Sequence, residues 1–188
     1  MPRKVEESVP KPYYTAGMVR EMPDDGNRYE VVYGELLVTP TPRVLHQLVV
    51  ARLTVALTQY ADRHGAGQVF GVPGAITWGR SDVLVQPDLF VVPLEEVRTN
   101  DWEQVRSLRL VVEVLSPSSS KSDRFTKRRR YQDARVPLYW VVDADQQRVE
   151  IWTPDDSFPR IEVKSLVWHP AGAREAFTLE LQELFRPV

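Results

Sequence analysis

Two apolar runs, Leu108-Arg-Leu-Val-Val-Glu-Val-Leu115 and Leu138-Tyr-Trp-Val-Val142, lie on either side of a basic segment. Each run is short, almost continuously apolar and rich in β-branched or aromatic residues, which predicts a buried strand. The basic residues 121–134 predict a helix that ends before Pro137. A strand–helix–strand unit of this kind forms a right-handed crossover between parallel strands. The sequence therefore predicts a mixed α/β fold.

The sequence around this unit predicts a hairpin, a long helix and more strands. Residues 29–38 form the hairpin, with a Tyr-Gly turn in the middle. The helix Val44–His64 has apolar residues at helical spacing and is followed by Gly65, a typical C-terminal cap. Further strands are predicted at residues 68–71, 75–78, 83–92 and 148–152. We expect 83–92 to lie beside the two apolar runs, in the centre of one sheet.

The composition is that of a globular protein with one domain. The chain has 188 residues, of which 43% are hydrophobic and 27% charged. We expect residues 1–28 to be a lead-in segment and residues 29–188 to be a single domain. The net charge of −2 creates no overall attraction to nucleic acid, so such binding would need a local basic patch. The absence of cysteine excludes disulfides, thiolate metal sites and cysteine nucleophiles.

The sequence also indicates the cellular compartment of the protein. Residues 1–17 are polar and proline-containing, unlike a secretory signal peptide. No stretch approaches the roughly 20 apolar residues that a membrane helix needs. We therefore expect a cytoplasmic protein without a membrane anchor.

Two acidic residues interrupt apolar strands. Asp88 follows Pro87, and a proline inside a strand favours a bulge that re-aims the next side chain. Glu113 lies between two valines, where an ionised carboxylate needs a cation, a proton or hydrogen-bond donors. A pair of carboxylates on neighbouring strands suits a divalent cation, and oxygen ligands favour Mg²⁺ or Mn²⁺ over zinc. For each acid alone, a salt bridge or a turn cap is an equal alternative.

The basic segment contains a second pattern. Asp123, Lys127 and Tyr131 recur at intervals of four residues, so they share one face of the predicted helix. The turn at residues 116–120 could return that face over Glu113. The alternative is an ordinary Asp–Lys pair on a solvated helix.

The order of these motifs resembles the Uma-type restriction endonuclease family. In chain order the matching residues are Tyr29-Glu-Val-Val-Tyr-Gly-Glu35-Leu, His46, Pro87-Asp88, Glu113-Val-Leu-Ser-Pro-Ser118, Asp123-Arg-Phe-Thr-Lys127 with Tyr131, and Val136-Pro-Leu-Tyr-Trp-Val-Val-Asp143. The resemblance covers about residues 29–152. It implies a restriction-endonuclease-like fold of the PD-(D/E)XK superfamily, in which helices flank a mixed sheet that carries an acidic metal site.

This resemblance implies an activity and assigns roles to residues. The activity is Mg²⁺- or Mn²⁺-dependent hydrolysis of phosphodiester bonds in DNA, with Asp88 and Glu113 as metal ligands. The superfamily pattern has a lysine two residues after the second acid, where this chain has Leu115. The resemblance implies that Lys127 supplies the catalytic cation instead.

Four residues are candidate accessories to the site: Glu35, His46, Asp123 and Tyr131. Glu35 matches a family position and could add a carboxylate, or it could be an exposed strand acid. His46 begins an apolar stripe, so it lies either at the site or in the core as a hydrogen-bonded histidine.

A dense basic segment is the natural candidate for binding phosphates. We expect phosphate contacts from Lys121, Arg124 and Arg128, although a run of charges on a helix is often only a solvated face. A homodimer is expected by analogy, because one small domain usually needs two active sites to cut both strands of a duplex.

Two other functions remain possible from the sequence. One is a catalytically silent nucleic-acid-binding or interaction module with the same fold, which Leu115 favours and the intact acid pair opposes. The other is a structural dimeric α/β domain with its acids in salt bridges.

Overall fold

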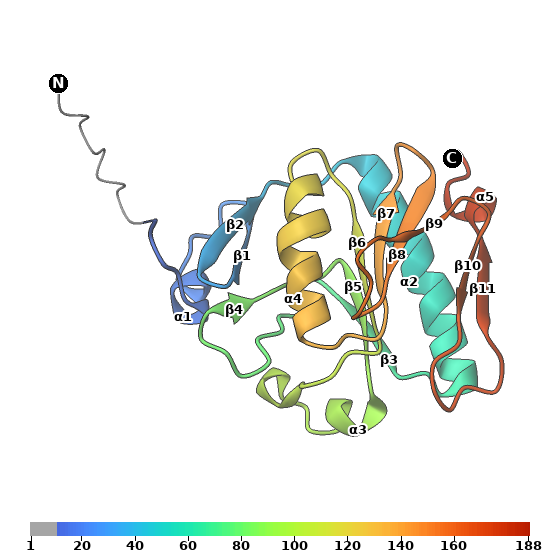
Figure 1. Ribbon diagram of the computed structural model, residues 1–188, viewed down its shortest axis with the longest axis horizontal. Coiled ribbons are helices and arrows are strands. Elements are labelled where there is room, and N and C mark those ends of the chain that lie inside the picture. Colours follow the sequence, from blue (N-terminus) through green and yellow to red (C-terminus); the bar gives the residue numbers. More distant parts are fainter. Residues whose placement is uncertain (1–10) are drawn as a thin grey trace.

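A six-stranded mixed sheet forms the centre of the protein, as the computed structural model of residues 11–188 shows (Figure 1). In order across the sheet its strands are β3 (Gln68–Gly71), β5 (Leu89–Val92), β6 (Leu110–Val114), β7 (Tyr139–Asp143), β8 (Arg148–Trp152) and β9 (Arg160–Glu162). β6 and β7 run parallel, and the other neighbours are antiparallel. The predicted crossover and the central position of β5, β6 and β7 are therefore confirmed.

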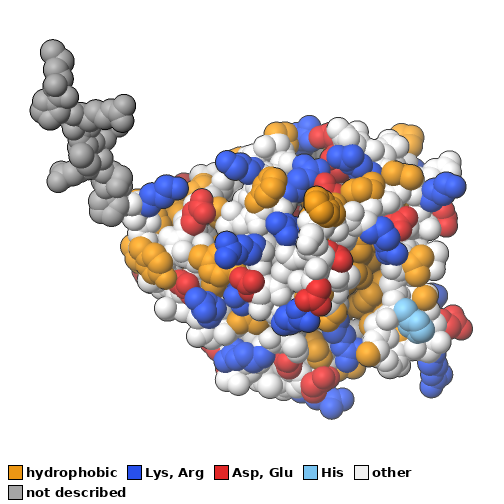
Figure 2. All heavy atoms as spheres, in the orientation of Figure 1, with side chains coloured by type: hydrophobic (Ala, Val, Ile, Leu, Met, Phe, Trp, Pro, Cys, Tyr) orange, Lys and Arg blue, Asp and Glu red, His pale blue; other side chains and the backbone are white. Residues whose placement is uncertain are grey.

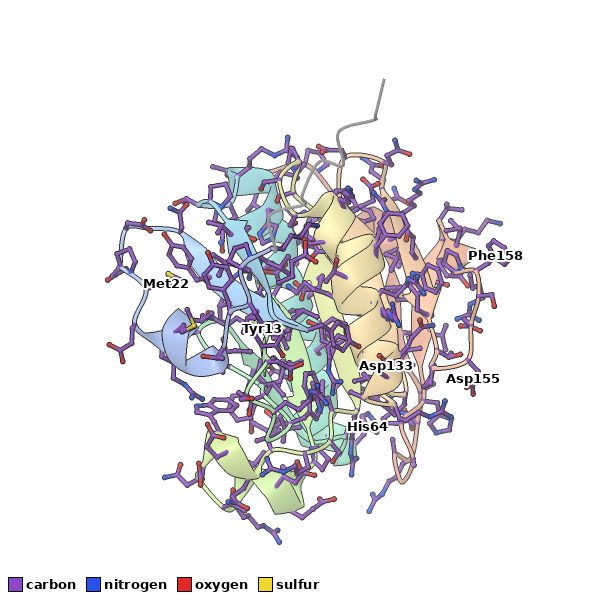
Figure 3. All side chains as sticks on the ribbon, turned by 60° about the vertical axis from the view of Figure 1, so that its left-hand side comes forward. Tyr13, Met22, His64, Asp133, Asp155 and Phe158 are labelled. Atoms are coloured by element: carbon purple, nitrogen blue, oxygen red, sulfur yellow. The ribbon has the colours of Figure 1, made fainter. Side chains whose placement is uncertain are left out.

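The remaining strands form two smaller sheets. They consist of β1 (Arg28–Val32), β2 (Glu35–Thr39) and β4 (Val83–Leu84), and of β10 (Ser165–Trp168) and β11 (Phe177–Glu180). β1 and β2 form the predicted hairpin around a Tyr33-Gly34 turn. Gly34 has a φ of 78°, and a Cβ on it would clash with the ring of Tyr13, which is labelled in Figure 3. The turn therefore requires glycine at this position.

The helices are α1 (Ala16–Arg20), α2 (Val44–His64), α3 (Leu94–Val97), α4 (Arg128–Asp133) and α5 (Leu181–Leu184), with a 3₁₀-helix η1 (Trp102–Gln104) and a π-helix η2 (Ser122–Lys127). α2 has the predicted bounds and ends at Gly65 in the left-handed conformation. Across residues 11–188, no helix combines the length and apolar character that crossing a membrane would require.

Two hydrophobic layers lie on opposite faces of the central sheet. Val112 and Val114 of β6 pack in the layer that α2 covers, whereas Val111 packs in the layer that contains Tyr131 of α4. In Figure 1, α4 and α2 lie on opposite sides of the central strands. Because side chains alternate along a strand, Glu113 points to the same face as Val111, toward η2 and α4.

The predicted strands at residues 75–78 and 83–92 are wrong in detail. Residues 75–78 contribute one isolated bridge, between Ile76 and Val85. Residues 83–92 divide into β4, which pairs with β1, and β5, which lies in the central sheet. Pro87 has no backbone N–H to donate, and the N–H of Gln86 donates to the carboxylate of Glu30 at 2.7 Å. Neither Gln86 nor Pro87 can therefore donate a backbone hydrogen bond to a neighbouring strand, which explains why the ladder breaks between β4 and β5.

The predicted helix at residues 121–134 is present, but it begins differently. Its first part is η2, and only then does the chain continue as α4. A π-helix is rare and often marks a functional site. Here it carries Asp123 and Lys127, both buried.

Part of the predicted lead-in belongs to the folded domain. Of residues 1–28, the first ten lie outside the described residues, and the others include α1. Ala16 and Val19 of α1 are buried against Val31 and Leu84. Two apolar contacts on a five-residue helix are too few to form a recognisable helical period.

Candidate active site

Asp88 directly precedes β5, and its carboxylate is turned into the protein, only 2% exposed. Oδ2 accepts a hydrogen bond from the backbone N–H of Val114 at 2.8 Å and lies 3.0 Å from His46 Nε2. Oδ1 accepts from Arg28 Nη1 at 2.7 Å. Burial favours the protonated form, but the contacts with His46 and Arg28 outweigh burial and hold the pKa of Asp88 well below its usual range. Asp88 is therefore an ionised carboxylate.

Glu113 lies beside Asp88 because β5 and β6 pair with Leu89 opposite Val112. Its side chain is fully buried. Oε1 accepts from the Tyr131 hydroxyl at 2.8 Å and lies 2.6 Å from Lys127 Nζ. Burial, with repulsion from the neighbouring carboxylates, raises the pKa of Glu113 to about 8, although Lys127 opposes the rise. Burial therefore favours the protonated form of Glu113 despite the neighbouring ammonium.

Lys127 returns from η2 toward the acid pair, as the sequence predicts. Its Nζ is 2.6 Å from Glu113, 3.0 Å from Glu30 and 3.5 Å from Asp123. Burial would lower the pKa of this ammonium, but the three carboxylates raise it above its usual value. Lys127 is therefore a permanently charged cation inside the protein.

Two members of the site, Glu30 and Arg28, were not identified from the sequence. Glu30 is buried and reaches Lys127 with one oxygen and the Gln86 N–H with the other. Like Glu113, it is a single carboxylate within a β-branched strand, and that signal was sufficient to find it. Arg28, two residues earlier on the same face of β1, carries no comparable signal in the sequence.

The structure places three of the four accessory candidates in the site and one outside it. His46, Asp123 and Tyr131 contact the Asp88–Glu113–Lys127 group directly. Burial raises the pKa of Asp123 to about 6, against the opposing effect of Lys127. Glu35 is exposed at the first position of β2, where it pairs with Val32 in the hairpin. The exposed-strand alternative describes Glu35, and Glu30 supplies the hairpin carboxylate of the site.

The three basic residues predicted to contact phosphates have different surroundings. Lys121 is exposed. Arg124 forms ion pairs with Glu150 at 2.7 Å and Asp143 at 3.0 Å. Arg128 stacks on the ring of Trp152, with its guanidinium carbon 4.5 Å from the ring centroid, and donates to Gln132. On the face that carries α4, Figure 2 shows basic and acidic side chains interspersed.

Four buried carboxylates therefore share one site with two permanent cations, Arg28 and Lys127. The carboxylates belong to Glu30, Asp88, Glu113 and Asp123. In residues 11–188, no group of three acidic or histidine side chains converges as a metal-binding group. The predicted pair of ligands, Asp88 and Glu113, offers hard oxygen donors of the kind that Mg²⁺ or Mn²⁺ prefers.

The mixed sheet, its flanking helices and the acids on adjacent strands place the protein in the class of restriction-endonuclease-like domains. The Uma2 family model, described as "Putative restriction endonuclease", matches residues 18–181, and the chain belongs to this family. A crystal structure of a putative nuclease of DUF820 from Anabaena variabilis has the same fold, with a TM-score of 0.76 and 20% identity. The similarity covers 91% of this chain and 97% of that one. No curated protein matches the chain.

Proposed function

We propose that the protein is a Mg²⁺- or Mn²⁺-dependent endonuclease that hydrolyses phosphodiester bonds of DNA. The observation that carries this proposal is the charge of the buried site. Four carboxylates surround two cations, and burial, together with repulsion from the neighbouring carboxylates, raises the pKa of Glu113 to about 8. Burying several carboxylates is costly to the fold, and perturbed buried carboxylates of this kind are typical of functional sites, including those that bind a divalent cation. Membership of the restriction endonuclease family supports the same reaction.

Asp88 and Glu113 are the proposed ligands of the cation. The bound metal would lower the pKa of a coordinated water, so that a hydroxide nucleophile is available near neutral pH. Arg28 Nη1 donates a hydrogen bond to Asp88 Oδ1 at 2.7 Å. The guanidinium matches the oxygens of a phosphate through its paired donors, so Arg28 would contact the substrate phosphate beside the acid pair.

Lys127 is the proposed catalytic cation. Its ammonium is fixed between Glu113 and Glu30, so it stays within reach of a nucleophile or of a phosphate oxygen at the acid pair. Its charge would orient the attacking water or neutralise charge that develops on the phosphate in the transition state. Tyr131 and Asp123 act as positioning residues, because they contact Glu113 and Lys127.

Leu115 does not contribute to this chemistry. It occupies the strand position of the usual lysine, and its side chain packs in the hydrophobic layer beneath α4. The proposal therefore depends on Lys127. If Lys127 has no catalytic role, the alternative function is that of a catalytically silent nucleic-acid-binding or interaction module.

The test combines cleavage with metal binding. Purified full-length protein is incubated with circular DNA in Mg²⁺, Mn²⁺ or EDTA, and Mn²⁺ binding is measured by calorimetry. We expect metal-dependent cleavage, with loss of both cleavage and Mn²⁺ binding in Asp88→Asn. The matched control is Glu35→Gln, which removes an exposed carboxylate outside the site. A parent protein that neither binds Mn²⁺ nor cuts DNA would refute the proposal and favour the silent module.

Two further expectations belong to this proposal. A homodimer is required only if both strands of a duplex are cut, because one site cuts one strand at a time. The cytoplasm is the proposed location, in keeping with a chain that contains no cysteine.

A further inference from the structure

A pocket of about 320 Å³ opens directly onto the acid site. Asp88, His46 and Arg28 line its inner part, together with the buried hydroxyls of Ser116 and Ser119. Because Asp88 is only 2% exposed and Glu113 is fully buried, a phosphate must enter the protein to reach them. The pocket lined by Asp88 is a route by which it can do so.

The volume of the pocket limits what can enter. Cavities of about 300 to 1,000 Å³ are typical of small-molecule sites, and this pocket is at the lower end of that range. A rigid duplex cannot enter such a space, since each of its phosphates is attached to stacked and paired bases. One nucleotide that has left the stack is a group of suitable size.

The charges around the pocket do not suit a duplex either. Among the described residues that line it, Arg28 is the one with a permanent positive charge, and Asp24 is a carboxylate on the outer part. Duplex binding depends on neutralising several phosphates in a row. Arg124 and Arg128, the expected source of such contacts, are engaged with other side chains and do not line the pocket.

The walls of the pocket combine groups that fit a nucleotide base. Asn27, Gln47 and Gln86 bring side-chain amides, which can pair with the edge of a base. Pro40 and Val50 add apolar surface, against which the face of a base can lie. Unpaired nucleotides are recognised in this way, through base edges and base faces together.

We propose that this pocket binds one unpaired nucleotide of a DNA strand, so that the substrate is single-stranded DNA or an unpaired segment of a duplex. The inference rests on the proposed nuclease function and specifies its substrate. Arg28 contacts the phosphate, and the amide-lined wall holds the base. A single strand needs one active site, which removes the reason for expecting a homodimer.

The experiment measures binding by fluorescence anisotropy with the full-length protein. The probes are a labelled 12-nucleotide strand and a hairpin duplex of the same sequence, each with Ca²⁺ as an oxygen-binding cation or with EDTA. We expect the strand to bind at least tenfold more tightly than the duplex, and only with the cation. Cleavage of both probes is followed in Mn²⁺.

A matched pair of variants on α2 tests the pocket itself. Gln47→Trp places an indole in the pocket, whereas Gln59→Trp places one on the same helix outside it; both glutamines are exposed. We expect Gln47→Trp to weaken strand binding tenfold or more, and Gln59→Trp to change it less than twofold. Circular dichroism confirms that both variants are folded. A Gln47→Trp variant that binds the strand like the parent would overturn the proposed site.

The remaining outcomes separate this inference from the proposed function. If the duplex binds as tightly as the strand and is cut, the inference is wrong and the nuclease function stands. If neither probe is bound or cut with any cation, both are wrong.

Discussion

Replacing Glu113 with glutamine is the most direct probe of the buried charge. The change keeps the shape of the side chain and removes one carboxylate from a group of four. Burial raises the pKa of Glu113 from the ordinary 4.5 to about 8. At about 1.4 kcal/mol for each pH unit, ionising Glu113 in the folded protein costs roughly 5 kcal/mol above pH 8. A glutamine avoids this cost but offers an N–H₂ group where Glu113 Oε2 lies 3.4 Å from the Asp88 N–H, a mismatch of about 1–3 kcal/mol.

The pH dependence of unfolding shows whether Glu113→Gln is more or less stable than the parent. Between pH 4.5 and 8 the folded protein keeps a proton on Glu113 that the unfolded chain has lost. The stability of the parent therefore falls as pH rises through this range. The variant has no such titration, so its advantage over the parent grows with pH. We expect no advantage at pH 5 and a gain of about 2–4 kcal/mol near pH 9 in EDTA.

Urea unfolding followed by the fluorescence of the five tryptophans measures this difference. The measurement is made at pH 5, 7 and 9 without metal, and repeated at pH 7 with Mn²⁺, which should stabilise the parent and not the variant. Glu35→Gln is the control, since it removes a carboxylate that water already solvates. A Glu113→Gln protein that is several kcal/mol less stable than the parent at every pH would refute the reasoning. It would show that the ion pair with Lys127 stabilises the fold.

Three more predictions concern the same site. Lys127→Met should abolish DNA cleavage in Mn²⁺ without weakening metal binding, because lysine acts on the nucleophile or phosphate; cleavage at the parent rate would exclude its catalytic role. Arg28→Gln should raise Mn²⁺ affinity about tenfold in calorimetry, because the guanidinium no longer competes for Asp88 Oδ1, and an unchanged affinity would contradict that competition. In the parent, Mn²⁺ affinity should rise roughly tenfold per pH unit from pH 6 to 8 and then level off, because the metal must displace the proton of Glu113. A flat profile would show that Glu113 is not a ligand.

The sequence predicted the elements whose pattern is local. α2 has its predicted bounds because its apolar period and the following glycine are both visible in the sequence. β6 and β7 were predicted because each is apolar on both faces, as expected for the centre of a sheet. The carboxylate of Glu113 interrupts one of these apolar strands, and that local pattern pointed to the candidate site.

The parts that were missed depend on contacts between distant segments. Nothing near Arg28 indicates that its guanidinium meets a carboxylate that lies 60 residues later. The break between β4 and β5 depends partly on Glu30, which accepts from the Gln86 N–H across 56 residues. The π-helical turns of η2 have no sequence signature, because a π-helix and an α-helix use the same residue types.

The pairing of Glu30 with Lys127 spans 97 residues and joins the hairpin to the helix that follows β6. Closing a loop of that length is entropically unfavourable until the elements between its ends have packed. During synthesis the hairpin therefore leaves the ribosome long before the segment that supplies its ionic partner. The proposed hydrolytic centre therefore cannot assemble until both the hairpin and the segment that carries Lys127 have been synthesised and folded together.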